Sequence, residues 1–283
     1  MSGLRAQGLE AELTVTEDAE QAVEIARTAA LEVDAVVAVG GDGTLHHVVN
    51  GLIQSGAPCA LGVIPFGTGN DFVKMLDVPV HLESAIKIIA GGKRKVVDYG
   101  VLEIDMEHGE GTGIRRFFVN TLGIGLDAEV SHRATSFKML PGFLAYLAAL
   151  LNTLNNLQPT AARIVLDDAG PWFDGEILLS SVGNGTTSGG LFKLTPTAAF
   201  DDGWLDVCVI EGLSVPGVLW RIPRVLRGTH TGMRQYHAGR AKKVVVTTER
   251  GLPVHADGEI VTTEARRLTV QIVEKGVAVI VPG

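Results

Sequence analysis

An apolar run that stops in a glycine-rich loop constrains this chain more than any other feature. Residues 36–39 read Val-Val-Ala-Val, residues 40–44 read Gly-Gly-Asp-Gly-Thr, and apolar residues then recur at helical spacing from Leu45 to Ile53. That order predicts a strand, a tight loop and an amphipathic helix. Glycines let backbone N–H groups approach a ligand, and a helix N-terminus carries partial positive charge. The loop therefore predicts a phosphate site, and Asp42 fits there if a cation such as Mg²⁺ accompanies the phosphates.

The same pattern repeats immediately downstream. A short apolar strand is expected at 60–64, a glycine-rich turn at 65–70 and a helix from 71 to 76, followed by a helix at 82–90 and a strand at 95–97. A helix at 17–31, with Thr16 as its N-cap, precedes the first strand. This alternation predicts a parallel α/β sheet. Because such sheets bind phosphates at the carboxyl ends of their strands, Asp42 and Asp71 are expected to face one site.

The texture changes after residue 98. Two helices are expected, at 141–154 and 215–226, among β-rich segments at 117–121, 163–166, 176–182, 205–210, 243–248 and 268–272. The sequence therefore predicts an α/β domain at 1–98 with a parallel sheet, a mostly antiparallel β domain at 99–275, and a cleft between the two domains. A C-terminal strand near 276–283 is expected to return to the first domain.

Charge and hydropathy exclude several classes of protein. A net charge of −8 argues against nucleic-acid binding and against a general attraction to anionic membranes. The first ten residues do not form a signal peptide, and the apolar run at 143–151 is too short to span a bilayer. The two cysteines, Cys59 and Cys208, are predicted to be buried free thiols. These features predict a soluble cytoplasmic protein.

Five motifs, in order along nearly the whole chain, resemble the diacylglycerol kinase catalytic family, and most closely its soluble bacterial lipid kinases. They are the Gly-Gly-Asp-Gly-Thr loop, the Pro-Phe-Gly-Thr-Gly-Asn-Asp-Phe loop, the glycines at 183–190, the Asp-Asp-Gly-Trp-Leu-Asp turn at 201–206 and the Asp-Gly-Glu turn at 257–259. The first motif alone would also admit NAD kinases and phosphofructokinases. A lysine-containing P-loop sequence does not occur.

The resemblance implies ATP and Mg²⁺ as cofactors. It gives Asp42 and Asp71 the role of organising them, and Glu259 the role of general base for a lipid hydroxyl. His255 is the alternative base, but an exposed histidine at a strand end is the preferred interpretation. The implied nucleotide-contacting positions are Thr16, Gly40, Gly41, Asp42, Gly43, Thr44, Gly67, Thr68, Gly69 and Asn70.

A structural Mg²⁺ is also implied at the second aspartate turn, held by Asp202 and by the backbone carbonyls of Ala199 and Trp204. Without the resemblance, that turn reads only as a β-turn. The implied acceptor is a membrane lipid, with diacylglycerol as the expected one, so we expect peripheral contact with the inner membrane face. The segment 215–226 could lie in a membrane interface, although packing in the core is the preferred interpretation for it and for 143–151. The sequence leaves open whether the chain forms a homodimer.

The chain departs from the family pattern at two places. The family usually continues the first motif with Asn-Glu, where this chain has His46 and His47. The family also normally has an additional strand before the helix at 17–31, so either the start site is misassigned or the sheet lacks a strand and exposes an edge. Two alternative functions follow: a nucleotide- or lipid-binding regulator with little kinase activity, and an NAD kinase.

Overall fold

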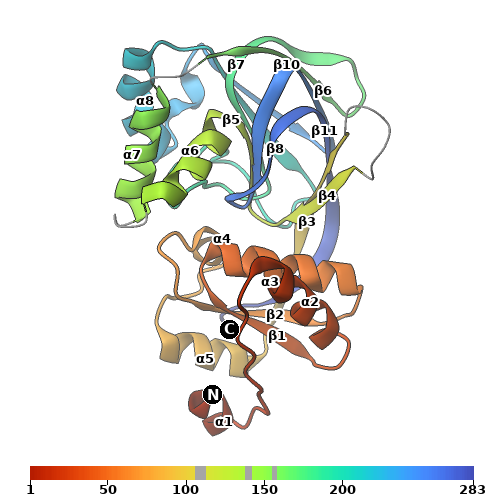
Figure 1. Ribbon diagram of the computed structural model, residues 1–283. Coiled ribbons are helices and arrows are strands. Elements are labelled where there is room, and N and C mark those ends of the chain that lie inside the picture. Colours follow the sequence, from red (N-terminus) through yellow and green to blue (C-terminus); the bar gives the residue numbers. More distant parts are fainter. Residues whose placement is uncertain (106–112, 138–141, 155–157) are drawn as a thin grey trace. The chain divides into compact units, whose positions relative to one another are not determined.

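The computed structural model describes residues 1–105, 113–137, 142–154 and 158–283 (Figure 1). The chain divides into two compact units, Met1–Asp98 with Glu274–Gly283, and Tyr99–Val273. Strand β3 (Arg94–Ile104) leads out of the first unit, and the long strand β11 (Glu259–Ile280) leads back into it. The α/β character of the first unit and the antiparallel β character of the second confirm the predicted fold class.

The first unit is built on parallel strands. β1 (Ala35–Gly40) pairs with β2 (Ala60–Pro65) over six residues, and the end of β11 pairs with β2 in parallel. Helices α2 (Ala19–Ala29) and α3 (Asp42–Ser55) lie on one side of this sheet and α5 (Leu82–Gly91) on the other (Figure 1). The short helices α1 (Ser2–Ala6) and α4 (Asp71–Met75) complete the unit.

The strand order explains where the ligand loops lie. All six residues of β2 are buried, as expected for a strand covered on both faces. Gly40 and Pro65 are register partners at the carboxyl ends of β1 and β2, so both glycine-rich loops leave the sheet at the same end of the strands. Among the strands that the structure describes, β1 lies at the end of the order and is an edge strand.

The second unit is an antiparallel β structure with helices beside it. β5 (Thr121–Gly125) lies between β10 (Lys243–Ala256) and β7 (Pro171–Gly183), and the order continues through β8 (Leu205–Glu211) to β9 (Tyr236–Ala241). β4 (Ile114–Phe118) pairs with β3, and β6 (Thr160–Leu166) pairs with β7 and β10. Figure 1 shows α6 (Leu126–Ala134), α7 (Gly142–Leu154) and α8 (Val215–Arg227) together beside the strands. Two 3₁₀ turns, Thr135–Phe137 and His230–Gly232, complete the unit.

Several local expectations are wrong. The N-cap of α2 is Asp18, whose carboxylate accepts the backbone N–H of Gln21 at 2.8 Å, so Thr16 does not cap this helix. The single strand expected at 117–121 is two strands, β4 and β5. Helix α6 and strand β9 were not predicted, and Pro141, expected to begin α7, lies outside the described residues.

Two further sequence expectations can be compared with the structure. Both cysteines are buried free thiols, as predicted, and burial raises the pKa of Cys208 far above its usual range. Among the helices in the described part of the chain, none combines the length and apolarity needed to cross a bilayer.

The contact between α2 and α3 depends on Gly51. A Cβ there would collide with the carbonyl oxygen of Val23 and lie 2.7 Å from the Cβ of Ala26. We expect Gly51→Ala to lower the free energy of unfolding by about 1–3 kcal/mol, because the backbone atom cannot move aside as a side chain would. Gly91→Ala is the control, since no atom lies within 4 Å of its added Cβ. Chemical denaturation of both variants measures the difference, and equal stabilities would contradict the prediction.

Candidate active site

The first candidate element is the junction of β1 and α3. β1 ends at Gly40, Gly41 is the N-cap of α3, and Asp42 is the first residue of that 14-residue helix. The N-cap Gly41 has no side chain and so makes no side-chain capping hydrogen bond. The backbone N–H groups of the first turn are therefore directed at the loop, where partial positive charge suits an anion.

The second element is the loop that follows β2. Asn70 has a left-handed backbone conformation with φ of 53°, and its side chain closes the loop on itself. Its Nδ2 donates to the carbonyl oxygen of Gly67 at 2.6 Å, and its Oδ1 accepts the Gly67 N–H at 3.1 Å. Asn70 thus fixes the shape of this loop, a role that the sequence motif did not reveal.

The carboxylate of Asp42 joins the two loops. Its Oδ2 accepts the backbone N–H of Asn70 at 2.7 Å, and its Oδ1 accepts the N–H of Asp71 at 2.9 Å. Bonds from N–H groups to an ionised carboxylate are stronger than bonds between neutral groups. The structure therefore brings Asp42 and Asp71 together, with Asp42 anchoring the second loop to the start of α3.

Glycines permit the close approach of these loops. A Cβ on Gly67 would lie 2.5 Å from the Cα of Gly41, and one on Gly41 would lie 3.0 Å from the Cα of Gly67. A Cβ on Gly40 would collide with the side chain of Thr44. The N–H of Phe66 also donates to the carbonyl oxygen of Gly40 at 2.8 Å. The result is a narrow cradle of backbone that suits the phosphates of a nucleotide.

The other predicted nucleotide residues lie around this cradle or apart from it. Thr68 is exposed on the second loop, next to Gly69, and Gly43 belongs to the first turn of α3. Thr16 is exposed in the irregular segment before α2. His46, where the family has asparagine, is buried within α3 and contacts Asn50. Ligand contact by Thr16, Gly43, Thr68 and Gly69 stays a prediction.

The Asp-Gly-Glu turn lies in the second unit, between β10 and β11. The carboxylate of Asp257 accepts the backbone N–H groups of residues 119–121 at 2.8 to 3.1 Å, which fixes the turn against the start of β5. Asp257 and Gly258 both have positive φ, at 52° and 90°. Glu259 follows as an exposed residue whose carboxylate has no hydrogen-bond partner in the described part of the chain.

His255 is buried beneath this turn, so its interpretation as an exposed strand-end histidine is wrong. The Gly258 N–H donates to its Nδ1 at 3.1 Å, and its Nε2 lies 3.0 Å from the Oδ2 of Asp127. A nitrogen that accepts leaves the other to carry the hydrogen, so Nε2 donates to the carboxylate. Both ring nitrogens are therefore occupied, and His255 is not placed to act as a base on a substrate.

Sequence reasoning missed Asp127, which contacts His255 and through it supports the Asp-Gly-Glu turn. Its carboxylate is buried in α6, accepts the hydroxyl of Ser188 at 3.1 Å and contacts His255. A Cβ on Gly123 would collide with both members of the Asp127–His255 pair, so the glycine makes room for it. The available signal was a single aspartate in the otherwise apolar stretch 124–128.

The turn expected to hold a structural metal is arranged differently. Asp202 Oδ1 accepts the backbone N–H of Trp204 at 3.1 Å, and its Oδ2 forms an ion pair with Arg240. Burial lowers the pKa of Arg240, but contacts with Asp202 and Asp206 outweigh this effect and raise the pKa above its ordinary value. A guanidinium thus occupies the carboxylate face that a cation would use. As arranged, these residues do not fit a bound metal, and the site with Ala199 stays a prediction of the resemblance.

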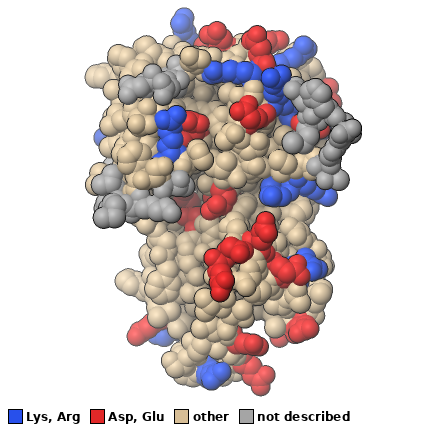
Figure 2. All heavy atoms as spheres, in the orientation of Figure 1, with Lys and Arg blue, Asp and Glu red and all other residues tan. Residues whose placement is uncertain are grey.

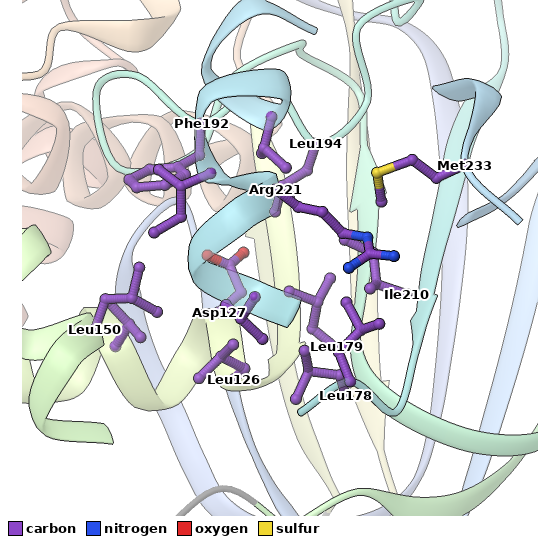
Figure 3. Close-up of a pocket in the computed structure, with 15 residues that line it drawn as sticks. Leu126, Asp127, Leu150, Leu178, Leu179, Phe192, Leu194, Ile210, Arg221 and Met233 are labelled. Atoms are coloured by element: carbon purple, nitrogen blue, oxygen red, sulfur yellow. The ribbon is translucent and has the colours of Figure 1, made fainter. Parts of the chain in front are cut away.

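An apolar pocket lies in the second unit, enclosed by α6, α7, α8 and strands β7 and β8 (Figure 3). It contains about 600 Å³ of empty space, part of it open solvent, and its lining is almost wholly apolar. Asp127 and Arg221 are the ionisable residues of its lining in the described structure, and Leu150 shows that α7 forms part of the wall. The Nε of Arg221 is buried and has no hydrogen-bond partner among the described residues.

Comparisons with known proteins agree with this architecture. The diacylglycerol kinase catalytic domain matches residues 2–102, and the YegS C-terminal NAD kinase beta sandwich-like domain matches residues 120–281. A diacylglycerol kinase of Staphylococcus saprophyticus is 31% identical over 90% of this chain and 80% of its own length. The chain belongs to the diacylglycerol kinase family. Another member, the diacylglycerol kinase of Bacillus subtilis, is 32% identical over 89% of this chain and 80% of its own length.

Solved structures show the same fold in this family. A Bacillus anthracis diacylglycerol kinase superposes with a TM-score of 0.74 at 22% identity, covering 100% of this chain and 89% of that chain. A yeast NADH kinase superposes more distantly, with a TM-score of 0.51 at 13% identity over 89% of this chain and 62% of that chain. At these identities, both similarities concern the fold alone.

The Asp42 anchor predicts a local effect on the second loop. Asp42→Ala removes the acceptor for two backbone N–H groups and should lower the free energy of unfolding by about 1–3 kcal/mol. The amides of Asn70 and Asp71 should exchange hydrogen faster, as measured by NMR or mass spectrometry. Asp77→Asn is the control. Asp77 has positive φ, a conformation that asparagine tolerates, and this variant should leave both amides unchanged. Unchanged exchange in Asp42→Ala would refute the anchoring role.

Two substitutions of His255 separate its two hydrogen bonds. Asparagine can keep an acceptor near the Nδ1 position, whereas glutamine can keep a donor near the Nε2 position. We expect His255→Asn to lower the free energy of unfolding by about 1–3 kcal/mol, because the buried Asp127 carboxylate loses a donor. His255→Gln should be less destabilised but should show faster exchange of the Gly258 amide. Identical behaviour of the two variants would contradict this assignment.

Proposed function

We propose that the protein is an ATP-dependent lipid kinase that transfers the γ-phosphoryl group to the hydroxyl of diacylglycerol and yields phosphatidic acid. Membership of the diacylglycerol kinase family supports the kinase part of this proposal. The choice of a lipid acceptor needs support from the chain's own residues, because members of one fold can act on different acceptors.

The main support for a lipid acceptor is the link between the apolar pocket and the Asp-Gly-Glu turn. Asp127 lines the pocket and contacts His255, and His255 accepts the backbone N–H of Gly258. Two hydrogen bonds therefore separate a pocket suited to a hydrocarbon chain from the residue that precedes Glu259. An acyl chain in this pocket would keep its glycerol end in the same unit as the proposed base.

The donor side of the reaction is assigned to the first unit. The N–H groups of the first turn of α3 and the loop anchored by Asp42 would hold the phosphates of ATP. Asp42 and Asp71 would also hold Mg²⁺, because they meet at this cradle and carboxylate oxygens are ligands that Mg²⁺ prefers. Bound with the nucleotide, Mg²⁺ would neutralise phosphate charge.

Glu259 is the proposed general base. Its carboxylate is exposed and would accept the proton of the lipid hydroxyl as the hydroxyl oxygen bonds to the γ-phosphorus. The bond from the γ-phosphorus to the bridging oxygen breaks, and ADP leaves with that oxygen. Positioning and charge stabilisation supply most of the catalysis in phosphoryl transfer, and the base contributes by orienting the nucleophile.

The pocket also argues against NAD as the acceptor. Among the described residues, its lining is leucine, valine, isoleucine, phenylalanine and methionine, apart from Asp127 and Arg221. A dinucleotide carries many hydroxyl and phosphate oxygens that would lose their hydrogen bonds to water in such a pocket. The kinship with the yeast NADH kinase is one of fold and adds no support for that acceptor.

Substitution of Glu259 tests the proposal. In vesicles that contain diacylglycerol, with labelled ATP and Mg²⁺, we expect Glu259→Gln to lower kcat by roughly 10²–10⁴-fold, because the neutral amide cannot accept the proton. ATP affinity, measured separately by calorimetry, should be unchanged. Glu264→Gln makes the same change at another exposed residue of β11 and should keep full activity.

The acceptor panel decides among the alternatives. Sphingoid base, ceramide and NAD are offered in parallel with diacylglycerol. Transfer to NAD alone would replace the proposal with an NAD kinase. ATP binding with no transfer to any acceptor, unaffected by Glu259→Gln, would indicate a regulator.

A further inference from the structure

Helix α8 presents an unusual outward face. Its inner face contains the buried Val218 and Val225, with Ile222 partly buried against the same core cluster. A surface helix that has buried one apolar stripe normally shows polar and charged residues on the other side. Here, the outward side shows Trp220 at 76% exposure and Leu219 at 40%, with Val215, Pro216 and Pro223 also exposed.

The charge of this helix has one sign. Its thirteen residues include three arginines and no acidic residue, in a chain whose net charge is −8. Arg224 and Arg227 are exposed, and within the described part of the structure neither forms an ion pair. The first unit contrasts with this, because residues 10–24 contain six acidic residues and no basic one. Figure 2 shows acidic side chains gathered on the surface of that unit.

We propose that the outward face of α8 docks the protein on an anionic lipid bilayer, with Trp220 and Leu219 inserted at the interface and Arg224 and Arg227 against lipid phosphates. Tryptophan is favoured at membrane interfaces because its ring is apolar and its N–H is polar. Arginines beside an inserted apolar face add attraction to anionic head groups. An acidic protein surface would match the arginines, and a neutral one would match the apolar residues. An anionic bilayer matches both.

The location of the pocket strengthens this choice. The inner side of α8 contributes Val218, Arg221, Ile222 and Val225 to the pocket wall (Figure 3). A helix that lies in the interface would therefore separate membrane lipid from the pocket by the thickness of one helix. This part of the argument rests on the proposed function, because it takes the pocket as the acceptor site; the docking surface itself does not.

Binding to vesicles, without ATP and without diacylglycerol, tests docking separately from catalysis. The full chain is floated with vesicles of phosphatidylcholine alone or with about 30 mole per cent phosphatidylglycerol added, which supplies anionic head groups. We expect binding to the anionic vesicles, with at least about tenfold weaker binding for Trp220→Ser and about fivefold weaker binding for Arg227→Gln. As controls at exposed residues outside α8, Val15→Ser replaces an apolar side chain by serine and Arg163→Gln repeats the change made at Arg227; both should bind as the unmodified chain does.

Fluorescence identifies the inserted residue. Bromine atoms on the acyl chains should quench tryptophan emission in the unmodified chain, and this quenching should disappear in Trp220→Phe, which keeps the apolar contact. Equal vesicle binding by Trp220→Ser and the unmodified chain would overturn the proposal. So would quenching that persists in Trp220→Phe, or a Trp220-dependent dimer that fails to bind vesicles, because the face would then be a protein interface.

Activity separates this proposal from the proposed function. Trp220→Ser should phosphorylate short-chain diacylglycerol in solution as fast as the unmodified chain, but should act more slowly on diacylglycerol embedded in anionic vesicles. An unmodified chain that docks on vesicles and yet phosphorylates no lipid would refute the proposed function alone. A slow Trp220→Ser variant in both assays, with normal thermal stability, would refute docking as the cause.

Discussion

The bonds from the Asp42 carboxylate to the N–H groups of Asn70 and Asp71 are the contact on which the candidate nucleotide site depends. Parallel pairing of β1 and β2 brings two loops to one edge of a sheet, but it does not determine their shapes. One carboxylate at the start of α3 fixes the second loop, and glycines at positions 41 and 67 allow the two backbones to meet. An anion cradle made from backbone requires this kind of external support, because glycine loops have high conformational freedom.

The second unit uses the same device. The carboxylate of Asp257 accepts three backbone N–H groups, and the buried Asp127–His255 pair holds the same turn from below. Each aspartate holds a turn next to a residue with a predicted functional role, Asp71 in the first unit and Glu259 in the second. In both units, the most recognisable aspartate of a motif therefore has a structural task, and that task constrains any chemical role assigned to it.

How far the sequence could be interpreted follows from the range of each interaction. Strand-loop-helix units are local, so the periodicity from residue 36 to residue 76 predicts them correctly. The N-cap of α2 is Asp18 and not Thr16, because the N-cap depends on which side chain reaches a nearby N–H. The pairing of Asp127 with His255 spans 128 positions of sequence, and no local pattern signals it. The ion pair of Asp202 with Arg240 likewise changes a predicted metal turn, through a residue of strand β9 that is distant in sequence.

The sequence by itself determined the fold class, the two loops at the carboxyl ends of parallel strands and membership of the diacylglycerol kinase family, since glycine spacing and hydrophobic period are encoded in consecutive residues. Tertiary structure alone decided that His255 is buried, that the wall of an apolar pocket is joined to the Asp-Gly-Glu turn, and that α8 hides one apolar face while exposing Trp220. The reason is physical: burial and partnership depend on which distant segments pack together, and a helical stripe looks the same in sequence whether it faces the core or the solvent.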